Sequence, residues 1–428
     1  MAQNPFTVGQ AVSPERFVGR ESQIEIAFDQ ISSRGNLAVW GGPGIGKTSF
    51  LELLTSPDVW HLQGQDPEAA VIVLLNCLSI QRFNADSFWR QILTETKSQL
   101  DSNPTLQTDI DQLLAQEKVT SSHLRQLLRK LGEYDKFLLL LVDDYDVALR
   151  TNDGYQEADI EAFVNECRSI ANSGIERKYI SMIVASSRRL SELGPQLTPD
   201  KSPWYNHYLF QPLKPFTDSE VAALLLGMPI TPALRDGIRE IADGNPALLQ
   251  NAGYLLYQEL RANRVPDPKT FARDFLSATE QFFQATWELC NDLEKILLML
   301  IALCSLEGRL SDKRYALKGI DTIFSQKEIE LNALETRGII KREEQAGKAT
   351  YSFASSLMEW WVVKNIQNST EAELQERQKV FLNLMSHKQA EKVKDIIRLM
   401  WKNKDKIPDI FEWIGKVMAA IPKGAIKS

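Results

Sequence analysis

The chain has 428 residues, of which 43% are apolar and 25% charged, and its formal net charge is −7. This composition is typical of a globular protein with about three domains, at roughly 150 residues each, and excludes collagen-like and disordered classes. The longest apolar run, residues 296–304, is far too short to span a bilayer, and no signal peptide is visible at the N-terminus; we therefore expect a cytoplasmic protein with no membrane partner.

The first half of the chain alternates between two kinds of segment. Short apolar runs with the length of buried strands occur at residues 37–40, 70–75, 137–142, 179–185 and 208–211. An expected helix at residues 21–31 precedes the first of these runs, and helical periodicity at residues 86–100 and 121–131 separates later ones. Such alternation predicts an α/β fold in which a parallel five-stranded sheet is covered by helices on both faces. We expect this domain to span residues 17–211, after an N-terminal arm of residues 1–16.

The pattern changes at the proline-marked stretch after residue 211, which indicates a domain boundary. Helical segments then dominate at residues 218–226, 231–242, 246–262 and 267–276, which predicts a helical lid domain over residues 212–285.

Residues 286–366 have a different outline. Expected helices at residues 293–306 and 326–337 precede two short strands at residues 339–342 and 350–353. Helices followed by a β-hairpin are the outline of a winged helix-turn-helix. Residues 367–428 are predicted to be a small helical segment with an amphipathic helix after Pro408.

The C-terminal segment differs from the rest in charge. Its last 43 residues carry ten Lys or Arg and five Asp or Glu, so this segment is +5 and the remainder −12. An acidic body argues against a broad nucleic-acid footprint, whereas a basic tail leaves nucleic acid, a membrane surface or an acidic protein as its partner. A solvated helix face is the alternative.

Cysteine and histidine suggest no metal site of their own. The four cysteines have no C-x-x-C spacing and the four histidines are dispersed, so we expect buried thiols and no zinc site. If the protein binds a metal ion, we expect the ion to bind together with a ligand.

Residues 41–48 read Gly-Gly-Pro-Gly-Ile-Gly-Lys-Thr, which satisfies G-x-x-x-x-G-K-[ST] between an expected strand and an expected helix. Glycines let the backbone wrap so that successive N–H groups point at phosphate oxygens. We expect Lys47 to lie on the β- and γ-phosphates of ATP or ADP, and Thr48 to give its hydroxyl to Mg²⁺. The residues predicted to bind the nucleotide here are Gly42, Pro43, Gly44, Ile45, Gly46, Lys47, Thr48 and Ser49.

The apolar run 137–142 ends in Asp143 and Asp144, which is the Walker B arrangement. We expect Asp143 to hold the Mg²⁺ shell and Asp144 to orient or activate the attacking water. Asp is shorter than the Glu common in fast ATPases of this broad class, which predicts slow hydrolysis. An unrelated acidic strand end is the alternative.

The next expected strand ends in Ser186, Ser187, Arg188 and Arg189. The carboxyl edge of an open α/β sheet is where ligands bind, so we expect Arg188 to sense the γ-phosphate and to belong to the catalytic set with Lys47, Asp143 and Asp144. A surface basic pair is the alternative.

From residue 4 to about residue 361 the chain resembles P-loop ATPases of the STAND and archaeal type, relatives of the AAA+ proteins. The phrases that carry the resemblance are NPF, PERFVGRE, GGPGIGKTS, LLVDD, SSR, DGNPALLQ and GIIKREEQAGKATYSFASSLMEWWV. The resemblance implies that Val18, Gly19 and Arg20 lie against the adenine, and that Pro246, in a G-x-P motif of the lid, touches the base. The chain lacks the Met-His-Asp triplet with which some STAND members hold ADP, and it has no unambiguous AAA+ arginine finger.

Three functions remain open. The first is an ATP-binding, slowly hydrolysing switch, which closes its lid and winged helix on binding ATP; the resemblance suggests bacterial defence or stress signalling. The second is a DNA-binding AAA+ initiator or loader that uses the winged helix. The third is a degenerate, structural nucleotide site, against which the intact Lys47, Thr48 and Asp143 count. The expected recognition helix 326–337 is net acidic, which does not favour DNA.

The expected partners follow from the switch hypothesis. We expect a homo-oligomer in the ATP state and a separate effector or sensor protein that binds the C-terminal segment. Trp401, Phe411 and Trp413 would anchor that contact, or else pack the tail against the winged helix.

Overall fold

The computed structural model describes residues 4–100, 103–196, 202–226, 228, 230–262, 264, 266–306, 317, 319–345 and 348–402, together with residues 404, 407, 410 and 419. The chain divides into two compact units. The sheet unit comprises residues 11–41 and 46–213, and the helical unit comprises residues 1–10, 42–45 and 214–428. The amphipathic helix expected after Pro408 lies outside the described residues. The domain boundaries expected at residues 285 and 366, on either side of the winged-helix domain, stay a prediction.

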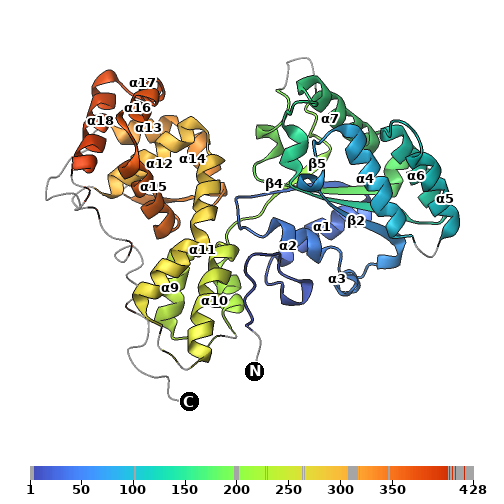
Figure 1. The fold of residues 1–428 in the computed structure, drawn as a ribbon, viewed down its shortest axis with the longest axis horizontal. Coiled ribbons are helices and arrows are strands. Elements are labelled where there is room, and N and C mark those ends of the chain that lie inside the picture. The colour runs from blue at the N-terminus through green and yellow to red at the C-terminus, as the bar shows by residue number, and fades with distance from the viewer. Residues whose placement is uncertain are drawn as a thin grey trace. The chain divides into compact units, whose positions relative to one another are not determined.

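The sheet unit is built on a five-stranded parallel sheet, which confirms the expected fold class (Figure 1). Its strands are β1 (Asn36–Trp40), β2 (Ala70–Asn76), β3 (Phe137–Asp143), β4 (Ile180–Ser186) and β5 (Tyr208–Pro212), in the order β2-β3-β4-β1-β5. Every residue of β1, β3 and β4 is buried, because these strands lie inside the sheet and helices cover both faces.

Several α-helices belong to the described part of the sheet unit. They are α1 (Glu21–Ser33), α2 (Lys47–Leu53), α3 (Pro57–Leu62), α4 (Ala85–Ser98), α5 (Pro104–Leu114), α6 (Ser121–Glu133) and α7 (Glu157–Asn172). Helices α4 and α7 cover one face of the sheet, and α1 and α2 cover the other (Figure 1). In α4 the side chain of Asn84 caps the helix through Ser87 N, and Phe88, Trp89 and Ile92 are buried.

The strand register brings the carboxyl ends of four strands to one edge. Trp40 at the end of β1 pairs with Ser186 at the end of β4. Asn76 at the end of β2 pairs with Asp143 at the end of β3. The residues that follow these strands therefore meet at the edge where open α/β sheets bind their ligands.

The described part of the helical unit contains a two-stranded antiparallel sheet, β6 (Ile340–Gln345) with β7 (Lys348–Phe353). Its helices are α8 (Asp218–Leu224), α9 (Pro232–Ala242), α10 (Pro246–Arg261), α11 (Pro268–Glu288), α12 (Asp292–Ser305), α13 (Ile320–Gln326), α14 (Glu328–Thr336), α15 (Ser356–Asn368), α16 (Glu371–Glu376), α17 (Gln378–Leu384) and α18 (His387–Lys402). One continuous apolar core joins them, from Phe6 in the N-terminal arm to Ile410.

The helix expected at residues 326–337 is present as α14, which begins at Glu328 because Lys327, with φ of −120° and ψ of 31°, lies outside the helical region. Another expectation for the helical unit was wrong in extent. Helix α11 continues to Glu288, well past residue 276, because Phe283 and Trp287 extend its buried face.

Helix α12 contains the apolar run 296–304 and is buried almost all round. None of the helices in the described part of the chain is long and apolar enough to cross a membrane. Cys77, Cys167 and Cys290 are buried as expected, Cys304 is half-buried, and none of these four described residues forms a disulfide. The described residues contain no cluster of three metal-ligating side chains.

Candidate nucleotide-binding site

The sheet unit brings the Walker residues together. Lys47 begins α2, and its Nζ donates to Gly41 O at 2.9 Å. The hydroxyl of Thr48 donates to Asp143 Oδ2 at 2.6 Å, so a residue of α2 meets the last residue of β3. The backbone N–H of Asp144 donates to the other oxygen of Asp143 at 3.0 Å.

Asp144 is held in a specific orientation. It is a non-glycine residue with a positive φ of 49°, and its Oδ2 accepts from Asn76 Nδ2 at 2.9 Å. Burial, and then the charge of Asp143, raise the pKa of Asp144 above its usual range. A carboxylate with a raised pKa, fixed by an amide, is suited to accept a proton from water.

Asp146 is a site residue that the sequence analysis missed. Its carboxylate accepts both the backbone N–H of Ser187, at 2.9 Å, and the Ser187 hydroxyl. Arg150 lies 3.8 Å from the same carboxylate. Asp146 therefore connects the segment after β3 to the segment after β4 by hydrogen bonds. The only signal in the sequence was a third acid shortly after Asp144, and no spacing rule links it to Ser187.

Lys47 is surrounded by these acids. Burial lowers the pKa of Lys47, while the charges of Asp146, Asp143 and Asp144, in decreasing order, act against that shift. The ammonium is therefore desolvated but compensated by carboxylates, as a group must be if it is to meet phosphate oxygens. The phosphate oxygens of a bound nucleotide would replace these carboxylates as the nearest negative charges to the Lys47 ammonium.

The residues present fit a magnesium ion. Thr48 Oγ1 and Asp143 Oδ2 are hard oxygen donors that already lie 2.6 Å apart. Mg²⁺ in nucleotide sites takes one or two protein oxygens together with phosphate oxygens. When bound, the ion would neutralise negative charge on the phosphates, while Thr48 and Asp143 would hold it.

Arg188 follows β4 but contacts an acid of its own segment. Its Nε lies 3.6 Å from Glu192 Oε2, and its carbonyl accepts from the Ser186 hydroxyl at 2.7 Å. A guanidinium beside Glu192 would have to leave that carboxylate to reach a phosphate. Its role as a phosphate sensor stays a prediction.

The segment expected near the adenine has an unusual backbone. Gly19 and Arg20 have positive φ values of 73° and 68°, and Arg20 is buried at the start of α1. Val18 precedes them directly. Ser49, predicted to bind nucleotide, accepts a hydrogen bond from Val12 N at 3.0 Å through its hydroxyl. The contacts of these residues with the base stay a prediction.

The apex of the phosphate loop, residues 42–45, belongs by its contacts to the helical unit. Asn245 Nδ2 donates to Pro43 O at 3.2 Å, and Ala247 N donates to Gly44 O at 3.1 Å. Gly44 and Gly46 have positive φ values of 74° and 94°, which explains why glycine stands at both positions. Pro246, expected to touch the base, is the first residue of α10, between the two residues that bind the loop.

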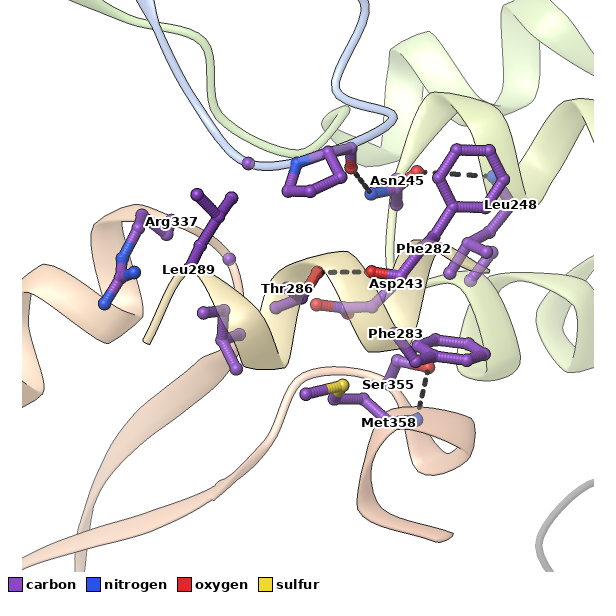
Figure 2. A pocket seen from close by; sticks show the side chains of 15 residues that line it. Asp243, Asn245, Leu248, Phe282, Phe283, Thr286, Leu289, Arg337, Ser355 and Met358 are labelled. Atoms are coloured by element: carbon purple, nitrogen blue, oxygen red, sulfur yellow. Dashed lines mark hydrogen bonds between the residues drawn. The ribbon is translucent and has the colours of Figure 1, made fainter. Parts of the chain in front are cut away.

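A pocket of about 590 Å³, including its open mouth, lies in the helical unit beside this contact (Figure 2). Its apolar walls include Leu248, Phe282, Phe283 and Met358 (Figure 2). Its other lining residues are Gly42, Pro43, Ala242, Asp243, Asn245, Thr286, Leu289, Arg337, Gly338, Ile339 and Ser355. The pocket therefore joins the phosphate loop to the G-x-P turn and to the turn before β6.

Part of the chain matches a known family, and its fold is similar to that of solved structures. Residues 16–169 match the family model of the AAA ATPase domain. The Walker-type ATPase PABY2304 of Pyrococcus abyssi is similar with a TM-score of 0.51 and 14% identity, over 84% of this chain and 99% of that chain. The ORC2 protein of Aeropyrum pernix is similar with a TM-score of 0.45 and 15% identity, over 90% of this chain and 94% of that chain. No curated protein compared with the chain matches it.

The parallel sheet and the Lys47, Thr48 and Asp143 cluster define a P-loop NTPase. Residues 16–169 match the AAA ATPase domain, and the fold of the chain is similar to that of an archaeal Walker-type ATPase. The resemblance to AAA+-related P-loop ATPases and the expected enzyme class, an ATPase, are confirmed at the level of this domain.

Proposed function

We propose that the protein is a STAND-like molecular switch, which binds ATP, hydrolyses it slowly, changes conformation or self-assembles, and signals through a separate partner. The observation that carries this proposal is the sharing of the phosphate loop. By their contacts, residues 42–45 belong to the helical unit, while Lys47 and Thr48 belong to the sheet unit. A ligand that makes different contacts with the loop in two states shifts the equilibrium between them.

In this proposal each site residue has a role. Lys47 binds the β- and γ-phosphates, Thr48 and Asp143 hold Mg²⁺, and Asp144 accepts the proton of the attacking water. Asn76 keeps Asp144 oriented through its 2.9 Å hydrogen bond. Hydrolysis is slow because the side chain of Asp144 is one methylene shorter than that of glutamate and reaches less far toward the attacking water.

The charges of the β6–β7 hairpin support the switch over a DNA-binding function. Lys341 is ion-paired with Asp243, and Arg342 lies 3.6 Å from Glu344. Lys327, between α13 and α14, lies 3.9 Å from Glu330. Basic side chains that are already paired with acids gain little by neutralising DNA phosphates.

A DNA-binding initiator is the second candidate. Helices α13 and α14, followed by the antiparallel β6–β7 hairpin, have the order of a winged helix-turn-helix, which we propose for this region. In that case α14 would be the element nearest to the DNA groove.

We propose that a separate partner binds the C-terminal segment. In α18, Lys394 pairs with Glu391 at 2.6 Å and Arg398 pairs with Glu371 at 2.5 Å, so part of its basic charge is neutralised internally. Trp401 Nε1 donates to Ile366 O at 3.0 Å, which favours a packing role for this tryptophan. Phe411 and Trp413 lie outside the described residues.

The experiment is to measure particle mass by mass photometry with ADP, with ATP and Mg²⁺, and with ATP and duplex DNA. Lys47→Ala is the test variant. Lys136→Ala is its matched control, because Lys136 also donates to a backbone carbonyl, at 2.6 Å. We expect assembly with ATP alone, lost only in Lys47→Ala. Assembly that requires DNA would support the initiator, and an unchanged mass in every condition would contradict self-assembly.

A further inference from the structure

The side chain of Asn245 makes contacts in two directions. Its Oδ1 accepts from Ala247 N at 3.0 Å and from Leu248 N at 3.2 Å, which caps α10. Its Nδ2 donates to Pro43 O at 3.2 Å, across 202 positions of the sequence (Figure 2). One residue thus begins α10 and binds the phosphate loop.

The contact is close as well as hydrogen-bonded. Ala247 N also donates to Gly44 O at 3.1 Å. A Cβ added at Gly44 would lie 2.7 Å from the Cβ of Ala247 and 3.3 Å from the ring of Phe282. The loop apex is therefore packed against α10 and α11, and its conformation is fixed from the side of the helical unit.

These bonds do not use the backbone N–H groups of the loop. Asn245 and Ala247 use the carbonyl oxygens of Pro43 and Gly44. Phosphates are bound by backbone N–H groups of such a loop. One conformation of the loop can therefore bind α10 through its carbonyl oxygens and a phosphate through its N–H groups. A bound phosphate and the Asn245 side chain do not compete for the same atoms.

We propose that Asn245 is a positioning residue: by holding Pro43 it fixes the phosphate loop in its binding conformation, and nucleotide binding in turn strengthens the contact between the loop and α10. This inference rests on nucleotide binding by the proposed site. The coupling is reciprocal, because two binding events linked through one conformation affect each other equally.

The substitution Asn245→Ser separates the two roles of the side chain. Serine caps a helix as well as asparagine does, but it has no amide group to reach Pro43 O. Asn245→Asp also keeps the cap acceptor and loses the donor. The control is Asn251→Ser in the same helix, whose Nδ2 donates to Ala247 O at 2.7 Å and not to the loop.

The experiment titrates the full-length protein and its variants with N-methylanthraniloyl-ADP and follows hydrogen exchange of α10 and the loop with and without ADP. Loss of one hydrogen bond should weaken binding about 3- to 10-fold in Asn245→Ser, with less than about a 2-fold change in Asn251→Ser. ADP should protect the first turn of α10 from exchange in the natural protein and not in Asn245→Ser. The melting temperature without nucleotide should stay close to that of the natural protein.

Equal affinity and equal ADP-dependent protection in Asn245→Ser and the natural protein would overturn the positioning role while leaving nucleotide binding intact. An equal loss in Asn251→Ser would also overturn it, because the effect would then be general loosening of α10. If Asn245→Ser does not fold, the same comparison is made with Asn245→Asp. A natural protein that binds no ADP would instead overturn the proposed function on which the inference rests.

Discussion

Asp146 offers the sharpest test of how the sheet unit builds its site. Its carboxylate is 9% exposed and accepts two hydrogen bonds from Ser187. A hydrogen bond to a charged group contributes about 1.5 to 3 kcal/mol. Asp146→Ala removes both and leaves a buried N–H without its acceptor, whereas relief from burying the carboxylate offsets part of the loss. We expect a net loss of about 3 kcal/mol in the free energy of unfolding.

The loss should be visible as a lower melting temperature. For a unit of about 200 residues, 1 kcal/mol corresponds to about 2 to 4 °C, so Asp146→Ala should melt about 6 to 12 °C lower. Asp146→Asn keeps an acceptor for Ser187 N and should lose less stability. It still removes the acid with the largest effect on Lys47, so the pKa of Lys47 should fall further. Because one carboxylate fewer then competes with the phosphates for Lys47 and repels them, nucleotide affinity should rise.

The assay combines thermal melting by circular dichroism with titration of a fluorescent ADP analogue. The control is Asp111→Ala, because Asp111 is 56% exposed and its 2.6 Å pair with Lys97 should contribute less than about 1 kcal/mol. A melting temperature for Asp146→Ala no lower than that of Asp111→Ala would refute the structural role. Unchanged nucleotide affinity in Asp146→Asn would refute the electrostatic role.

Three further predictions concern hydrolysis and the N-terminal arm. Asp144→Asn should retain ATP binding but lower phosphate release at least about 100-fold, and equal rates would show that Asp144 is not the base. Because burial raises the pKa of Asp144, hydrolysis by the natural protein should fall as the pH is lowered, starting above the usual titration range of an aspartate; a flat profile to pH 4 would contradict this. Phe6 is 4% exposed and fills the space beside Gly253, so Phe6→Ala should cost about 3 kcal/mol in urea unfolding followed by tryptophan fluorescence, and an unchanged midpoint would contradict that packing.

Local sequence patterns determined much of the sheet unit. The apolar run 137–142 predicted β3 because a strand buried on both faces needs apolar side chains at every position. The G-x-x-x-x-G-K-[ST] pattern located the phosphate loop because its glycines must adopt positive φ, as Gly44 and Gly46 do. The pairing of Thr48 with Asp143 followed from the two Walker motifs, each of which is contiguous in sequence.

Tertiary structure alone decided the partners that no contiguous motif contains. Asn76 reaches Asp144 because β2 and β3 are paired in a register that ends both strands together. Asp146 reaches Ser187 because β3 and β4 are neighbours in the sheet although 41 positions separate the two residues. Asn245 reaches Pro43 through the packing of α10 on the loop. A motif records what neighbouring residues in the chain must do, whereas these contacts depend on which strands and helices become neighbours once the chain has folded.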